Sequence, residues 1–386
     1  MKDNGKRCKV KVSCLQENLA RGLTIVGRAV AARSTLPVVS NVLLATDDSR
    51  LKLAATNLEI AITSWTPARV DEEGAITIPA RLLNEFVSSL PTEKIDMALN
   101  VRTRTLNLKC ASYEANIKGI DAEEFPPIPR VSEEATTLAD PEQLRAAIGQ
   151  VAFAAATDDS RPVLAGVLAS FEGQTLTLAA ADGFRLAVRK VPLLQAVAER
   201  VEVVVPGRAM QELARILAEQ DEPVQISLTP NKSQVLFRMK DVELVSRLVQ
   251  GTFPNYQQII PQRYTTRVVV GTSELAKATK LASFFARDAA NVVRVQVTAG
   301  EDLKPGKLVV AATAAEVGDT VGGIDAVVEG ESVQIAFNAK YLADVLGVLN
   351  SNQVALEVTT SSSPGVVKPV GSDDYVHVIM PMHIAR

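Results

Sequence analysis

The sequence predicts an α+β protein of three repeated domains, each with two helices and antiparallel sheets. Sequence anchors recur at a nearly constant interval along the 386 residues. Apolar spacings of three and four predict helices, and apolar–polar alternation predicts half-exposed strands. A chain of this length also fits about three domains of ~100–200 residues each.

The repeat is defined by three anchors in the same order. A proline stands near the end of each copy, at 126, 254 and 381, so the intervals are 128 and 127 residues. An apolar strand-like element recurs at 51–56, 176–181 and 308–313, and a helix start at 78–81, 205–208 and 337–340. Three ordered anchors indicate one domain copied twice, which builds extended surfaces more readily than a single reaction centre.

The first helix of each copy is predicted from spacing and caps. One apolar stripe in the first copy contains Leu15, Leu19, Leu23, Val26 and Val30. Asp140 is the candidate N-cap in the second copy. In the third copy Thr272 or Ser273 is the candidate cap of a helix that reaches Phe285.

A second helix is expected in the middle of each copy, and strands surround it. The helix begins where proline or asparagine favours a start, at Pro79, Pro206 and Asn338. Alternating segments occur at 51–53, 176–178 and 235–239. Their period of two predicts antiparallel strands with one exposed face.

Composition excludes several classes of function. Cys8, Cys14 and Cys110 form no CxxC motif, so reduced thiols are favoured over a disulfide framework or a zinc site. His377 and His383 are the only histidines, too few for a histidine-based triad or metal site. We therefore expect no catalytic residues, metal or cofactor. No stretch approaches the ~18 apolar residues of a membrane span, which predicts a soluble intracellular protein.

The helices carry sparse basic residues on one face, although the net charge is −3. Arg21 and Arg28 are two helical turns apart, and Arg208 and Arg215 repeat that spacing. Acidic residues are interspersed, so these charges alone favour a solvated face by about two to one over a phosphate-binding surface.

Three segments carry further information: LAAADGFRLA at 178–187, GTFPNYQQIIP at 251–261 and VIMPMHI at 378–384. Together they resemble the bacterial DNA polymerase III beta subunit, the β sliding clamp family, which reads ATDGHRLA, FPDYRRVIP and VMPMRL at these places. The first copy agrees with RSTLP at 33–37 and with Asn41. The likeness covers essentially the whole chain, except for about seven N-terminal residues, a loop near 361–372 and a two-residue tail.

The resemblance implies a DNA-clamp fold with domains at 1–133, 134–264 and 265–386. It implies a head-to-tail homodimeric ring that encircles double-stranded DNA without sequence specificity and does not catalyse a reaction. DNA polymerase subunits and a clamp loader would bind through short linear motifs. The expected location is the bacterial cytoplasm, at the nucleoid. The alternative is a repeat-built interaction scaffold that does not encircle DNA.

The resemblance also implies a peptide-binding pocket between the second and third copies. Its residues would be Leu164, Gly183, Phe184, Arg185, Leu186, Pro254, Gln258, Ile259, Val378, Met380, Pro381 and Met382. Without the family pattern the two methionines would be assigned to the core. Methionine also suits a surface that accepts several partners.

The pocket departs from the family pattern at five positions. Phe184 replaces a histidine, Ala181 a threonine, Gln257 and Gln258 two basic residues, and His383 an arginine. We therefore expect a more apolar, less cationic pocket that still accepts a motif with glutamine and leucine or phenylalanine.

The resemblance moves the basic helix faces toward the interpretation of a DNA channel. The candidates are Arg21, Arg28, Arg33, Arg145, Arg208, Arg215, Lys277, Lys280 and Lys340. Such sparse cations would contact phosphates without reading bases.

Overall fold

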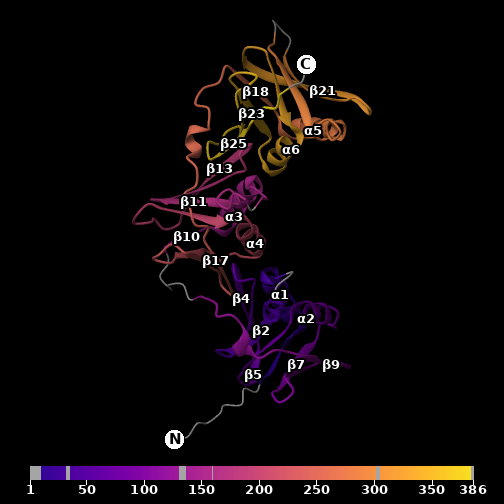
Figure 1. The fold of residues 1–386 in the computed structure, drawn as a ribbon, viewed down its shortest axis with the longest axis vertical. Helices are drawn as coiled ribbons and strands as arrows, with labels where there is room; N and C mark the ends of the chain where they lie inside the picture. Colours follow the sequence, from indigo (N-terminus) through magenta and orange to yellow (C-terminus); the bar gives the residue numbers. More distant parts are fainter. Residues whose placement is uncertain (1–9, 32–34, 130–135, 159, 301–304, 384–386) are drawn as a thin grey trace. The chain divides into compact units, whose positions relative to one another are not determined.

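A computed structural model describes residues 10–31, 35–129, 136–158, 160–300 and 305–383 (Figure 1). The chain divides into two compact units. Unit 1 comprises Met1–Pro141 and Arg215–Leu248, and unit 2 comprises Glu142–Ala214 and Val249–Arg386. Within the described ranges no helix has the length and apolar character needed to cross a membrane.

Unit 1 contains two helices and two antiparallel sheets. The helices are α1 (Gln16–Val26) and α2 (Ala80–Ser88), with short 3₁₀ turns at η1 (Gly27–Ala29), η2 (Pro37–Ser40) and η3 (Ala122–Glu124). One sheet has the order β5 (Arg69–Glu72), β1 (Lys11–Leu15), β7 (Lys94–Asn100), β8 (Thr105–Cys110) and β9 (Tyr113–Lys118). The other has the order β10 (Thr137–Ala139), β15 (Val224–Leu228), β16 (Gln234–Arg238), β17 (Val242–Arg247), β4 (Ile60–Pro67), β3 (Arg50–Thr56), β2 (Asn41–Asp47) and β6 (Ala75–Pro79).

Unit 2 is organised around one long antiparallel sheet. Its order is β14 (Val201–Pro206), β11 (Gly166–Glu172), β12 (Thr175–Ala181), β13 (Arg185–Pro192), β25 (Tyr375–Ile379), β24 (Gly365–Pro369), β23 (Gln353–Val358), β18 (Thr266–Gly271), β21 (Gly318–Gly330), β20 (Gly306–Ala314), β19 (Val292–Thr298) and β22 (Val333–Asn338). The other elements that lie wholly or mainly in unit 2 are α3 (Pro141–Val151), η4 (Ala152–Ala154), α4 (Gly207–Leu217), η5 (Tyr256–Gln258), α5 (Thr272–Ala286) and α6 (Ala339–Val348).

The predicted repeat is visible as three equivalent antiparallel meanders. They are β2–β3–β4, β11–β12–β13 and β19–β20–β21. A strand and a helix follow the second and third meanders, and the first has the additional strand β5 before its strand and helix. The three mid-copy helices follow Pro79, Pro206 and Asn338, as the sequence predicts. Antiparallel sheets with few helices therefore confirm the predicted fold class.

Helix boundaries follow local chemistry. Asn338 caps α6, because its side-chain oxygen accepts hydrogen bonds from the amides of Lys340 and Tyr341 at 2.9 and 3.4 Å. In the first copy the apolar stripe is longer than the helix. Leu15 ends strand β1 with an exposed side chain, and Val30 lies beyond η1.

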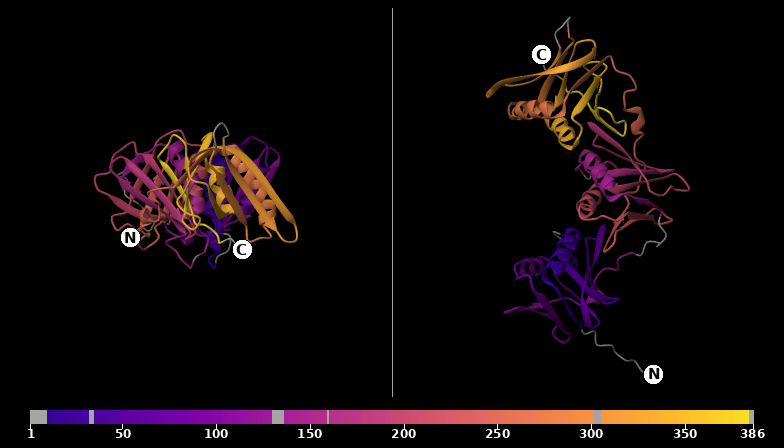
Figure 2. Two further views of the ribbon diagram at one scale, coloured as in Figure 1. Left: turned by 90° about the horizontal axis from the view of Figure 1, so that it is seen from above. Right: turned by 180° about the vertical axis from the view of Figure 1, so that it is seen from behind.

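The helices lie in pairs against the sheets. In unit 1, α1 packs beside α2 and against β3 and β4. In unit 2, α5 packs beside α6 and against β19, β20 and β21, as Figure 2 shows. The buried faces are apolar, so each unit is held together mainly by hydrophobic burial.

Two strand pairings join successive copies of the repeat. In unit 1, β4 pairs with β17, and Ala61 faces Val245. In unit 2, β13 pairs with β25, and Leu186 faces Val378. Each pairing makes one continuous sheet from segments that are far apart in the sequence.

The described cysteines are free thiols. Cys14 on β1 and Cys110 on β8 are buried. Strand β7 lies between these two strands, and its residue Ile95 pairs with Cys14 on one side and with Cys110 on the other. Burial is the main reason that the pKa of Cys14 is raised to about 12. Burial also raises the pKa of Cys110, so both thiols are protonated and unreactive at neutral pH. Cys8 lies outside the described residues.

Candidate peptide-binding site and basic helix faces

The floor of the predicted peptide site is a buried apolar cluster in unit 2. Leu186 and Val378 face each other across β13 and β25, and each is 1% exposed. Ala181 lies opposite Leu186 on β12. Leu164 packs against the same cluster and is half-buried. The structure therefore brings together three of the predicted pocket residues, Leu164, Leu186 and Val378, although Val378 lies far from the other two in the sequence.

The rim of the site is unusually exposed for apolar side chains. Phe184 is 59% exposed, Ile259 41% and Met380 39%. Pro254 is exposed beside Phe253, a member of the buried cluster. A buried floor with an exposed apolar rim is the arrangement expected of a binding surface.

A tight turn presents Phe184 at this rim. Asp182 Oδ1 accepts hydrogen bonds from the amides of Phe184 and Arg185, at 2.9 and 3.0 Å. Gly183 has φ +95°, a conformation that glycine adopts without strain. Strand β25 then fixes the turn, because the amide of Met380 donates to the carbonyl of Phe184 at 2.8 Å.

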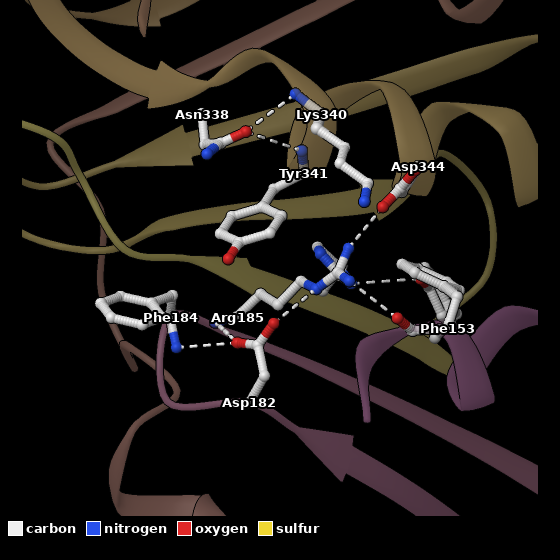
Figure 3. Close-up of polar contacts among 10 residues, drawn as sticks. Phe153, Asp182, Phe184, Arg185, Asn338, Lys340, Tyr341 and Asp344 are labelled. Carbon is white, nitrogen blue, oxygen red and sulfur yellow. Dashed lines mark hydrogen bonds and ion pairs between the residues drawn. The ribbon is translucent and has the colours of Figure 1, made fainter. Parts of the chain in front are cut away.

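Arg185 contributes its backbone to the site, whereas its side chain lies on the opposite face of the sheet from Leu186. Its side chain is 8% exposed and forms ion pairs with Asp182 at 3.0 Å and with Asp344 at 2.6 Å (Figure 3). It also donates to the carbonyl of Phe153 at 2.8 Å. The guanidinium lies 4.4 Å from the ring centre of Tyr341. Arg185 thus fastens the turn to helix α6 and to η4.

His377 occupies the same buried face. Its ring stacks on Phe153 with centroids 5.5 Å apart, and Nδ1 lies 3.4 Å from the Tyr375 hydroxyl. Nε2 has no hydrogen-bond partner. Burial, with a smaller contribution from Arg185, lowers the pKa of His377 to about 3. The imidazole is therefore neutral at physiological pH.

The remaining predicted pocket residues lie on two other segments. Gln258 is exposed at the end of η5. Pro381 and Met382 are half-buried. The amide of Met382 donates to the carbonyl of Ala336 at 2.8 Å, which anchors this segment to β22.

A hollow of about 500 Å³ lies beside the predicted site, and sequence reasoning missed it. Val188 and Val376 line it from the strands, and Tyr256, Gln257 and Ile260 line it from the loop above. The two valines lie two residues along their strands from the floor pair. The period of two could therefore have indicated that the apolar face continues.

The candidate DNA contacts are spread over several helices. Arg145 on α3, Arg208 on α4, Lys277 and Lys280 on α5, and Lys340 on α6 are exposed. Arg21 on α1 is exposed and pairs with Glu219 at 2.8 Å. Arg28 is half-buried, Arg215 is exposed, and both make further interactions. Arg33 lies outside the described residues.

The fold and site define a class: a repeat-built protein with an exposed apolar surface and exposed cations on its helices. Within the described ranges, no group of three or more His, Cys, Asp or Glu side chains is arranged to hold a metal ion. Three family models match consecutive spans of the chain. They are the N-terminal, central and C-terminal domains of the DNA polymerase III beta subunit, at 10–129, 139–255 and 257–383. The chain belongs to the DNA polymerase III beta subunit family.

Relatives and solved structures agree with this assignment along nearly the whole length. The beta sliding clamp of Synechococcus elongatus is 34% identical over 379 residues, covering 97% of this chain and 100% of that protein. The beta sliding clamp of Staphylococcus aureus is 30% identical, and the match covers 92% of this chain and 94% of that protein. The crystal structure of the Bacillus subtilis DNA polymerase sliding clamp is similar with a TM-score of 0.91, at 29% identity and 97% and 100% coverage. The crystal structure of the Pseudomonas aeruginosa DNA polymerase III subunit beta is similar with a TM-score of 0.89, at 30% identity. It covers 97% of this chain and 100% of that chain.

Family membership sets the general role of the chain. It is a non-catalytic processivity factor, a sliding clamp of a DNA polymerase. Its three clamp domains and antiparallel sheets are those of the sliding-clamp fold.

Proposed function

We propose that this clamp acts as a head-to-tail homodimeric ring that encircles double-stranded DNA and tethers replication proteins through short linear motifs. Its domains would be 1–133, 134–264 and 265–386. The observation that carries the proposal is the match of three consecutive clamp domains to one chain. A repeat-built scaffold that does not encircle DNA is the alternative.

Unpaired strand edges in two different copies support a head-to-tail contact. Strand β9 ends its sheet, and its first residue, Tyr113, is 57% exposed. On β21, the described pairing with β18 covers only residues 327–330. Residues 318–326 therefore present a free edge on that side, with Val321 67% exposed. Exposed edges of this kind favour pairing with another chain.

Apolar side chains beside the β21 edge favour the same contact. Leu281 and Phe284 on α5 are each 49% exposed, and α5 packs directly against β21. A contact between two different surfaces generates a ring when its rotation closes. Because the proposed contact joins the first copy of one subunit to the third copy of its partner, two such contacts would close a dimer.

The state of the protein in solution tests the dimer. Native mass spectrometry should give twice the chain mass of 41.3 kDa. A species at the single-chain mass over the micromolar range would contradict the proposal.

The DNA interaction would rest on scattered phosphate contacts. The exposed cations lie on four helices, α3, α4, α5 and α6, and the net charge of the chain is −3. Sparse contacts of this kind hold a duplex without reading its bases. Retention by encirclement does not require high affinity, so a net-acidic clamp can still slide on DNA.

The peptide site would bind motifs of DNA polymerase subunits and of a clamp loader. A leucine or phenylalanine of the motif would enter over Leu186 and Val378, and Phe184 and Met380 would cover it. The glutamines at 257 and 258 make the polar end less cationic than the family pattern. The site of action would be the bacterial cytoplasm, at the nucleoid.

A labelled motif peptide tests this site. Wild type should bind it, and the Met382→Ala, Pro254→Ala double variant should bind it more weakly. Equal binding by the two proteins would refute the site.

A further inference from the structure

The first two copies of the repeat share a turn geometry that extends to individual hydrogen bonds. Asn57 and Asp182 occupy the same position in their copies. Each Oδ1 accepts hydrogen bonds from the amides two and three residues further along, at 2.8 to 3.0 Å. The residues that follow them, Leu58 and Gly183, both have positive φ, at +77° and +95°. The turn that presents Phe184 at the predicted peptide site therefore has a counterpart in the first copy.

The strand that completes the site also has a counterpart. In unit 2, the amide of Met380 donates to the carbonyl of Phe184 at 2.8 Å. In unit 1, the amide of Arg247 donates to the carbonyl of Glu59 at 2.9 Å. Glu59 and Arg247 thus stand in unit 1 where Phe184 and Met380 stand in unit 2.

The apolar floor is reproduced as well. Ala61 faces Val245 on β4 and β17, in the register position that Leu186 and Val378 have in unit 2. Ala61 and Val245 are each 6% exposed. Because alanine replaces leucine on one side, the floor in unit 1 is deeper than the floor in unit 2.

A hollow of about 260 Å³ is present at this position. Its walls include Leu58, Ile60, Ala61, Pro126 and Val245, which are all apolar. Pro126 is the first-copy equivalent of Pro254. A cavity of roughly 150 Å³ accepts one benzene-sized group, so this hollow has room for a leucine or phenylalanine side chain and adjoining backbone.

We propose that this hollow is a second peptide-binding site, for a short linear segment with a leucine or phenylalanine beside an acidic residue. The apolar side chain would enter over Ala61 and Val245. Arg247 lines the hollow and is exposed, and a guanidinium binds a carboxylate through paired hydrogen bonds. Glu59, also at the mouth, disfavours a second acidic residue on its own side.

The conformation of Leu58 gives independent support. A branched side chain rarely adopts positive φ, and Gly183 occupies the equivalent position without strain. Leu58 is nevertheless 43% exposed at the mouth of the hollow. An apolar side chain held in a strained backbone at a concave surface is typical of a binding residue rather than of a core residue.

The test uses a full-length background variant, Pro254→Ala with Met382→Ala, in which the predicted peptide site is disabled. The probe is a fluorescein-labelled peptide with a Leu-Phe-Asp core, which carries one acidic residue. The background should still bind it, with a Kd on the order of 10⁻⁴ M by fluorescence anisotropy. Adding Leu58→Gly should weaken binding by about fivefold or more, and Arg247→Glu should do the same.

Two controls make the result specific. Leu194→Ala removes an exposed leucine of unit 2, at 54% exposure, and should leave the affinity unchanged. Leu58→Gly should keep or raise the melting temperature, because glycine relieves the positive φ. The proposal is overturned if the background does not bind the peptide up to about 1 mM, or if Leu58→Gly and Arg247→Glu bind as tightly as the background.

Discussion

Arg185 Nη1 lies 2.6 Å from Asp344 Oδ2, although 159 residues separate the two in the sequence. Arg185 belongs to the span matched by the central-domain model, and Asp344 belongs to the span matched by the C-terminal model. The ion pair therefore joins two successive clamp domains directly behind the turn of the predicted peptide site. It makes the geometry of that turn depend on helix α6.

Asp344→Asn should destabilise unit 2. The substitution keeps the shape but removes one charge from a largely buried pair, while Asp182 still neutralises Arg185. We expect a loss of about 1–2 kcal/mol, seen as a melting temperature lower by a few degrees. Asp325→Asn, at an exposed position on β21, is the matched control. Equal melting temperatures of the two variants would show that the pair contributes little.

His377 should make stability fall at acidic pH. Its pKa is about 3 in the folded protein, against 6.5 as the ordinary value, so below about pH 6.5 the unfolded chain binds a proton that the native chain does not. The contribution is fully present above pH 6.5 and declines as pH falls toward 3, by up to about 1.4 kcal/mol per pH unit.

His377→Phe retains the stack on Phe153 and removes this titration. Urea unfolding between about pH 4.5 and 7.5 should give a shallower pH dependence for the variant than for wild type. Parallel curves would rule out His377 as the source.

Phe284→Glu should separate the subunits without disturbing the peptide site. A charge in an apolar contact is costly to bury, so the native mass should fall to that of one chain. Phe184→Glu changes another exposed phenylalanine, at the peptide site. This variant should keep the dimer and bind the motif peptide more weakly. If both variants keep the dimer, α5 is not at the interface.

Lys277→Glu with Lys280→Glu should weaken contact with DNA. Both residues are exposed on α5, so folding should be unaffected. Binding to a short duplex should show a log–log salt slope shallower by up to about two, as expected for two lost phosphate contacts. Lys307→Glu is the control, because Lys307 is exposed on β20 on the opposite face from the buried Leu308. An unchanged salt slope in the double variant would show that α5 does not contact the DNA.

Local signals predicted much of the fold. Helix starts at Pro79, Pro206 and Asn338 depend on backbone preferences within a few residues, so they could be read directly. The alternating elements at 51–53, 176–178 and 235–239 became β3, β12 and β16. The predicted first helix was too long at both ends. Leu15 and Val30 fit the apolar spacing but lie outside α1.

The candidate site was harder to predict, because its parts come from distant segments. The motif identified Arg185 but not the direction of its side chain, which the strand alternation turns away from Leu186. Its partners Asp344 and Phe153 have no local signal. The hollow of the first copy also depends on the pairing of β4 with β17, which no sequence pattern in either strand specifies.

Encirclement of DNA is the central claim, and release on linearisation tests it most directly. The labelled protein is loaded onto nicked circular DNA by a clamp loader, the complex is isolated, and the circle is cut once. A sliding ring should remain on the intact circle and leave through the free ends after cutting. Equal retention on circular and linear DNA would contradict encirclement and favour a surface-bound scaffold.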